Sequence, residues 1–253
     1  MKSFFESVGR FARFCGTVIL DLFRPPIELE QLWWEIGQIG SRSLPLVAAA
    51  GLASGVIMTL HSRTSLVRFG AVAMVPAVQS LGFFIEIGPL LTALLVSGRV
   101  GAGIGAVLSN MRATEQIDAI ESLSVDSFKF LVAPRVLACV LVLPLLTLFT
   151  DFSGLLGGYL AEFAASHMSG RLYIERAFSD LRWENFIPPT IKTSIFGFII
   201  GTVSSFFGYT TNEGADGVGR AATNSVVMSS LLVIVADIIL VRCIFLVFPE
   251  TAL

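Results

Sequence analysis

The feature that most constrains the fold of this chain is an uncharged run of eighteen residues, from Ser43 to Leu60. As a helix this run would extend about 27 Å, close to the thickness of the hydrocarbon core of a bilayer. The whole chain is similar in character. Of its 253 residues, 54% are hydrophobic and only 14% are charged, whereas soluble domains carry about 25% charged residues. The sequence therefore predicts an all-α membrane protein with several spans.

Apolar runs of comparable length predict five transmembrane helices. The expected spans are 43–62, 82–109, 133–162, 193–212 and 222–248. Residues 68–80 are expected to be interfacial or re-entrant, because Phe69 to Met111 is too long for one span and too short for two. The polar residues 163–192 are expected to form an external segment. The stretch "EGADGVGR" at 213–220 indicates a Gly-rich turn.

Residues 1–40 are predicted to form N-terminal interfacial helices ahead of a five-span domain over 41–253. Apolar residues form one stripe at helical spacing: Phe4, Val8, Phe11, Cys15, Val18 and Leu22. The charged side chains lie largely off this stripe, so an amphipathic helix is expected to lie in the interface plane. Pro25 and Pro26 are expected to end it. A second short helix would place Trp33 and Trp34 at headgroup depth.

The distribution of Lys and Arg predicts the orientation. With five spans, nine of these residues fall on the side of the N-terminus and six on the other side, and Lys192 is counted among the six. Positive loops face the cytoplasm, so the N-terminus and the 110–128 connection are expected there. Small residues also recur every four positions in three spans: Gly51 and Gly55; Ser97, Gly101, Gly105 and Ser109; Gly197, Gly201 and Ser205. Such faces indicate close helix packing within the chain or, alternatively, between copies.

Charged residues inside the predicted spans are the candidates for handling a substrate, because burying a charge in lipid costs several kcal/mol. They are Glu86, Arg99, Asp151, Asp237 and Arg242, with Glu86, Arg99 and Asp237 as lipid or gating candidates. Snorkelling to the headgroups or structural pairing are the alternatives. The sequence has no P-loop motif, no spacing typical of a metal site and no support for a hydrolytic triad. We therefore expect no catalytic activity, cofactor, metal or nucleic-acid partner for this chain.

The connection "NMRATEQIDAIESLSVDSF" at 110–128 predicts a short amphipathic helix over 113–123. It carries an apolar ridge of Ile117, Ile120 and Leu123 and an acidic flank of Glu115, Asp118 and Glu121. Thr114 is the expected N-cap, and Asp126 is expected to cap the next helix. A solvated loop needs no apolar ridge, whereas a helix that docks in a groove of a soluble partner does.

At these residues the sequence resembles the MlaE/YrbE family of permeases, the membrane subunits of ABC-type lipid transporters that work with MCE proteins. The resemblance covers about residues 40–245. It is carried by "EIGPLLTALLVSGRVGAGIGAVLSNM" (86–111), "TEQIDAIESLSVDSFKFLVAPRVLA" (114–138), "LPLLTLFTDFSGLLGG" (143–158) and "EGADGVGRAATNSVVMSSLLVIVAD" (213–237). The sequence departs from the family at Gln116, where a second Glu is usual, and at Ser127, where Pro is usual.

The resemblance implies a multi-pass protein of the inner membrane that forms a homodimer with a lipid cavity between the copies. It also implies ATP on two partner ATPase subunits and an MCE-domain protein on the other side. The coupling residues would be Glu115, Gln116, Ile117, Asp118, Ala119, Ile120 and Glu121, with Ile117 and Ile120 as anchors in the ATPase. A competing hypothesis is an ion-coupled secondary carrier that uses Glu86, Asp151 and Asp237. A non-transporting membrane scaffold is a third.

Overall fold

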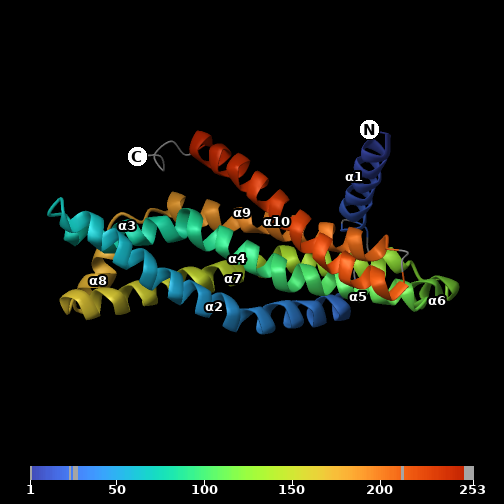
Figure 1. The fold of residues 1–253 in the computed structure, drawn as a ribbon, viewed down its shortest axis with the longest axis horizontal. Helices are drawn as coiled ribbons and strands as arrows, with labels where there is room; N and C mark the ends of the chain where they lie inside the picture. Colours follow the sequence, from blue (N-terminus) through green and yellow to red (C-terminus); the bar gives the residue numbers. More distant parts are fainter. Residues whose placement is uncertain (1, 23, 25–27, 212–213, 248–253) are drawn as a thin grey trace. The chain divides into compact units, whose positions relative to one another are not determined.

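The computed structural model describes residues 2–22, 24, 28–211 and 214–247, and every regular element in these ranges is helical (Figure 1). In chain order the helices are α1 (Lys2–Leu22), α2 (Leu29–Val67), η1 (Val72–Met74), α3 (Val75–Gly82), η2 (Phe83–Ile87), α4 (Gly88–Val96), η3 (Ser97–Gly101), α5 (Ala102–Ala113), α6 (Gln116–Ser122), α7 (Ser127–Ser166), α8 (Gly170–Ala177), α9 (Trp183–Tyr209) and α10 (Gly214–Val247).

Five stretches of the described chain are long and apolar enough to cross a membrane. They are Leu29–Val67, Val72–Ala113, Ser127–Ser166, Trp183–Tyr209 and Asp216–Val247. The predicted fold class, an all-α membrane protein with five spans, is confirmed. The helices divide into two compact units. Unit 1 comprises Met1–Gly40, Val96–Val142 and Ile195–Val233, and unit 2 comprises Ser41–Leu95, Leu143–Ser194 and Ile234–Leu253. Each contact described below lies within one unit.

The helix that contains the first predicted span begins before that span. α2 is one helix from Leu29 to Val67, so the expected second interfacial helix is its first part. The charge of Glu35 in this first part is compensated, because its buried carboxylate lies 3.0 Å from Nε of Arg135 on α7. Trp33 and Trp34 remain exposed. The expected helix end at Pro25 and Pro26 falls outside the described residues.

The helical stretch that contains the second predicted span also begins before that span. η1 to α5 follow one another without a gap, so most of the expected interfacial segment 68–80 continues helically into the span. Pro76 fits because it stands in the first turn of α3, where a helix needs no N–H donor. The π-helical turns η2 and η3 accommodate extra residues in this helix, and such turns are frequent at functional sites.

The last two spans correct two further expectations. α9 starts at Trp183, so residues 183–192 of the expected external segment belong to the helix that contains the fourth predicted span. Gly214 to Arg220 form the first turns of α10, and the predicted Gly-rich turn is wrong there. Three predicted positions fall outside the described residues. They are Asn212 at the end of the fourth predicted span, Glu213 in the predicted turn and residue 248 at the end of the fifth predicted span.

The small-residue faces pack inside each unit. In unit 2, Gly51 faces the backbone of Thr150, so any larger side chain would collide with α7. In unit 1, Gly105 faces Ser225 of α10 and Gly197 faces the backbone of Cys139. These close approaches favour packing within the chain over the alternative of an interface between copies.

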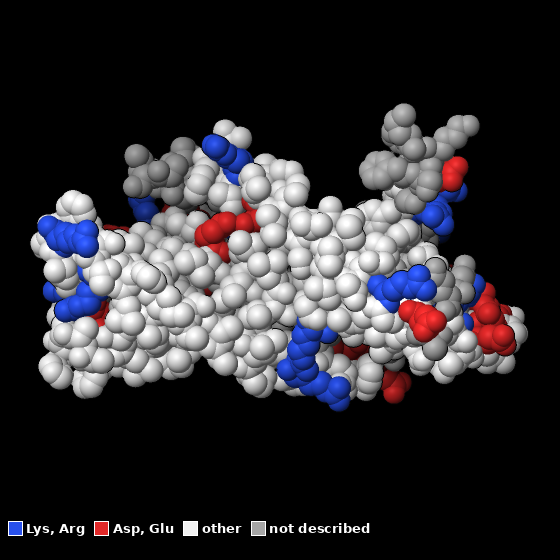
Figure 2. All heavy atoms as spheres, viewed as in Figure 1, with Lys and Arg blue, Asp and Glu red and all other residues white. Residues whose placement is uncertain are grey.

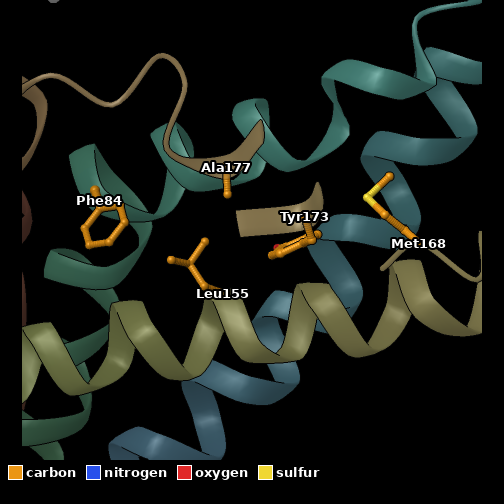
Figure 3. Packing of buried hydrophobic residues seen from close by; sticks show 5 residues of the cluster. All are labelled: Phe84, Leu155, Met168, Tyr173 and Ala177. Carbon is orange, nitrogen blue, oxygen red and sulfur yellow. The ribbon is translucent and has the colours of Figure 1, made fainter. Parts of the chain in front are cut away.

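Each unit has its own aromatic core. In unit 2 the side chains of Phe84, Leu155, Met168, Tyr173 and Ala177 converge where α8 packs beside α3 (Figure 3). In unit 1 a core of Phe14, Val18, Val132 and Val136 is extended by Phe128, Phe206 and Tyr209. The Phe14 and Phe128 rings meet edge to face, 4.8 Å apart. α1 is therefore fixed to α7 and α9 through its buried stripe.

Candidate functional site

The helix α6 connects α5 to α7 and lies inside the predicted 113–123 segment. Glu115 has a left-handed φ of 58°, which turns the chain sharply before α6, and Ser124, with φ 61°, turns it again afterwards. Thr114 ends α5 and does not cap α6, as its hydroxyl donates to the Asn110 carbonyl at 2.8 Å. Two tight turns therefore hold this short helix directly between two spans.

Asp126 caps α7 as predicted. Its Oδ1 accepts hydrogen bonds from the backbone N–H groups of Phe128, at 3.1 Å, and Lys129, at 3.2 Å. Ser127, which stands where the family pattern has Pro, adds a link that Pro cannot make. Its hydroxyl donates to the Glu121 carboxylate at 2.6 Å and lies 2.8 Å from the Tyr209 hydroxyl on α9.

The apolar ridge of α6 is divided between the protein core and the surface. Ile117 is fully buried, because α6 packs back on α5, so its expected exposure to a partner needs correction. Ile120 is half-buried. The exposed apolar side chains of this connection are those of Leu123, which is 76% exposed, and Val125, which is 43% exposed. The accessible ridge is therefore displaced towards the C-terminal end of the connection.

The acidic flank is exposed and partly occupied by contacts within the chain. Asp118 lies 2.8 Å from the Arg112 guanidinium, in a solvent-exposed pair. Glu121 accepts from Ser127 and, at 3.2 Å, from Tyr209. Glu115, together with Gln116 and Ala119, is exposed. Acidic side chains gather over α6 at the right of Figure 2.

A second cluster of charges lies among the spans of unit 2. The ammonium group of Lys192 on α9 lies 2.9 Å from Oδ1 of Asp237 on α10 and 3.0 Å from Oε2 of Glu86 on η2. The side chains of Lys192 and Asp237 are only 2% and 5% exposed, whereas that of Glu86 is 41% exposed. Lys192 thus has one buried partner and one accessible partner.

Comparison with known proteins shows a match to the permease MlaE family model over residues 32–243, which include α6 and all three residues of the Lys192 cluster. The chain belongs to the MlaE permease family. It is 38% identical over 242 residues to a probable ABC transporter permease protein of Rickettsia typhi, an alignment covering 96% of this chain and 93% of the relative.

More distant relatives extend the same comparison. A probable ABC transporter permease protein of Synechocystis is 31% identical over 240 residues, covering 94% of this chain and 90% of the relative. The chloroplastic protein TRIGALACTOSYLDIACYLGLYCEROL 1 of Arabidopsis thaliana is 31% identical over 225 residues, covering 89% of this chain and 64% of the relative. The family membership predicted from the four sequence blocks is confirmed.

Within this permease, the sequence predicted two members of the Lys192 cluster and missed the third. Lys192 was assigned to an external segment because the uncharged run starts only at Thr193. No local signal would have found it, because Pro188 and Pro189 favour a helix that starts after them, whereas α9 includes both and places Lys192 about two and a half turns from its start. Lys192 therefore does not count among the external positive charges, just as the buried Arg135 in α7 does not count among those on the N-terminal side.

The other intramembrane candidates are not part of this cluster. Arg99 is half-buried on η3 in unit 1, and Arg242 is exposed on α10. Asp151 is buried on α7, and its carboxylate forms no hydrogen bond with the described residues. It lies against Gly88, where any side chain would overlap it. Gly88 therefore provides the space for this carboxyl group.

The permease also has a buried polar network that the sequence did not indicate. Gln79 accepts hydrogen bonds from Thr59 and, at 3.0 Å, from Tyr173 on α8, while its amide donates to the Gly154 carbonyl at 3.0 Å. Burial raises the pKa of the Tyr173 phenol, so this donor stays protonated. Arg63, one helical turn after Thr59, forms an ion pair in which its guanidinium lies 2.5 Å from the buried carboxylate of Glu162. These bonds join α2, α3, α7 and α8 in unit 2.

No group of three His, Cys, Asp or Glu side chains in the described part of the permease is arranged to hold a metal ion. The three cysteines are free thiols, and Cys139 is buried in the core of unit 1. Within these residues the chemistry available is ionic and hydrogen-bonding, at α6 and around Lys192.

Proposed function

We propose that this chain is the non-catalytic permease subunit of an ABC-type transporter that moves phospholipid-like lipids across or out of the inner membrane. A separate ATPase subunit would bind and hydrolyse ATP and dock on α6. A second copy of the chain and an MCE-domain protein would complete the assembly. The chain itself would bind no cofactor. The observation that carries the proposal is α6, a short helix held directly between two spans with an exposed acidic and apolar surface.

The anchoring of α6 supports its role in coupling. Buried Ile117 fixes one end to the chain, and the bonds of Glu121 to Ser127 and Tyr209 fix the other end to α7 and α9. A displacement of α6 by a partner would therefore be transmitted to these helices. Leu123 and Val125 are the apolar contacts available to an ATPase groove, and each contributes about 1.5–3 kcal/mol if fully buried there.

The Lys192 cluster supports a lipid with a charged headgroup. Asp237 is the buried partner of the ammonium, whereas Glu86 is accessible. A lipid phosphate is chemically able to replace the Glu86 carboxylate on Lys192, because both are anionic oxygen acceptors. The Arabidopsis relative is named after a glycerolipid with an uncharged headgroup, trigalactosyldiacylglycerol, so its name supports a lipid substrate and only the Lys192 cluster supports the charge. The same cluster is less suited to an ion-coupled carrier, since Glu86 and Asp237 already share a cation.

The decisive experiment tests α6. The double variant Leu123→Arg/Val125→Arg is expected to lose the ATPase subunit during purification and to lose lipid-stimulated ATP hydrolysis in proteoliposomes. Both changes lie on the exposed surface, so the permease should remain folded. Ile174→Arg is the matched control, because Ile174 is 60% exposed on α8, in the connection between the third and fourth spans. Wild-type yield and activity of the double variant would refute the coupling role.

The proposed orientation has its own test. The N-terminus and α6 would be cytoplasmic, and α8 would lie on the outer side. Single cysteines placed at Glu121 and at Glu175, in a cysteine-free background, should be labelled by a membrane-impermeant reagent from opposite sides of the membrane. Labelling of both from one side would exclude this topology.

A further inference from the structure

An apolar groove of about 500 Å³ lies between α1, α9 and α10 of unit 1. It is lined by Val8, Arg10 and Phe11 of α1, by Val203, Phe206, Phe207 and Thr210 of α9, and by Met228 and Leu232 of α10. This volume is in the range of small-molecule binding sites, about 300–1,000 Å³. Its lining is apolar along the helices and polar only at Arg10 and Thr210. It thus has the amphipathic character of a lipid site.

A second hollow, of about 380 Å³, adjoins the groove. The two share Phe207 and Thr210, and the second is otherwise lined by Thr211, Gly217, Arg220, Ala221 and Asn224. It therefore adds a guanidinium, a hydroxyl and an amide to the polar end. None of the described lining residues of either hollow is acidic. The guanidinium groups of Arg10 and Arg220 are the charged groups of this lining, and each has several N–H donors, so it can bind an anion in addition to the contacts it already makes.

The polar and apolar parts are ordered along the axes of α9 and α10. Thr210 and Thr211 follow the last helical turn of α9, and Arg220 and Asn224 belong to the first turns of α10, so they lie at the ends of two spans. Val203 lies seven residues before Thr210, about 10 Å deeper. The groove therefore places a headgroup at the membrane surface and directs an acyl chain into the hydrocarbon core.

We propose that this groove binds an anionic phospholipid of the adjacent leaflet, with its phosphate between Arg10 and Arg220 and one acyl chain along Val203, Phe206 and Met228. Basic pockets between spans are sites of this kind. The lipid would join α1 to α9 and α10 as a resident ligand. This site is distinct in residues from the Lys192 cluster, and its occupation does not depend on transport.

The first test is a titration of the purified full-length chain in neutral detergent. Native mass spectrometry should detect tight binding of phosphatidylglycerol and much weaker binding of phosphatidylcholine with the same acyl chains. The variant Arg10→Gln/Arg220→Gln should bind phosphatidylglycerol about tenfold to thirtyfold more weakly, in line with the loss of two charge contacts. Arg13→Gln is the matched control, because Arg13 is exposed on the same helix and does not line the groove.

The second test locates the acyl chain and does not require the arginines to be changed. Met228→Trp fills the apolar part, because Met228 is 40% exposed at the groove, and it should weaken binding of both lipids. Phosphatidylglycerol with a photoactivatable acyl chain should label peptides that contain Val203 to Thr210. The proposal would be overturned by any one of three results. These are equal affinity of the chain for the two lipids, wild-type affinity of Arg10→Gln/Arg220→Gln for phosphatidylglycerol, or photolabelling confined to other helices.

Discussion

The α6 connection in unit 1 and the Lys192 cluster in unit 2 satisfy their charges in opposite ways. Asp118 and Arg112 are six residues apart, as are Glu121 and Ser127; Asp118 and Glu121 are exposed, Arg112 is half-buried and Ser127 is buried. Lys192 is separated by 45 residues from Asp237 and by 106 from Glu86, and its ammonium is buried. Water and salt screen the exposed Asp118–Arg112 pair but not the buried Lys192–Asp237 pair. The first pair is therefore suited to reversible contacts, whereas the second is a fixed part of the fold.

The largest expected effect is at Lys192. Lys192→Met leaves the buried Asp237 carboxylate without its cation, and breaking a buried pair in this way costs about 3–5 kcal/mol. We expect a large fall in the free energy of unfolding, measured by titration with denaturing detergent. The triple variant Lys192→Met/Glu86→Gln/Asp237→Asn should recover most of it. Wild-type stability of Lys192→Met would show that the cluster does not hold the spans together.

A smaller effect is expected from Gly88→Ala. The added methyl group overlaps the Asp151 carboxyl group, and overpacking of this kind costs about 1–3 kcal/mol. Gly103→Ala is the control, because a methyl group at Gly103 meets no atom within 4 Å. It should be neutral or stabilising, since Ala favours a helix over Gly by about 1 kcal/mol. Equal melting temperatures for the two variants would contradict the close contact between Gly88 and Asp151.

The fixation of α6 is tested by Tyr209→Phe, which removes one hydroxyl from the bonds around Glu121. A net loss of about 0.5–1.5 kcal/mol is expected for such a bond. The loss should be local, so hydrogen exchange should accelerate in Gln116–Ser122 while α8 in unit 2 is unaffected. Unchanged exchange of α6 would show that Tyr209 does not hold it.

The smallest effect on stability is expected at Asp118. Its pair with Arg112 is exposed, and exposed pairs contribute about 0–1 kcal/mol. Asp118→Asn should leave the unfolding midpoint nearly unchanged. The same substitution should weaken association with the ATPase at low ionic strength and have little effect at high ionic strength, because an exposed charge steers association. A salt-independent loss of association would instead indicate a change in the shape of α6.

The sequence by itself determined the features that depend on local pattern. Apolar run length fixed the number of spans, because a helix must match the bilayer thickness. The position of α6 and the cap at Asp126 followed from helical spacing and from the carboxylate's ability to bind free N–H groups. Each of the four family blocks is a continuous stretch of sequence, and together they predicted the permease family correctly.

Tertiary structure decided which side chains meet across the chain. Lys192 became a buried partner of Asp237 and Glu86 only because α9, α10 and η2 converge, and no local spacing records that convergence. Ile117 belonged to a regular ridge in the sequence, yet packing against α5 buried it and left Leu123 and Val125 accessible. Periodicity identifies the apolar face of a helix, whereas the surface that covers that face is set by distant segments whose packing free energy depends on the whole fold.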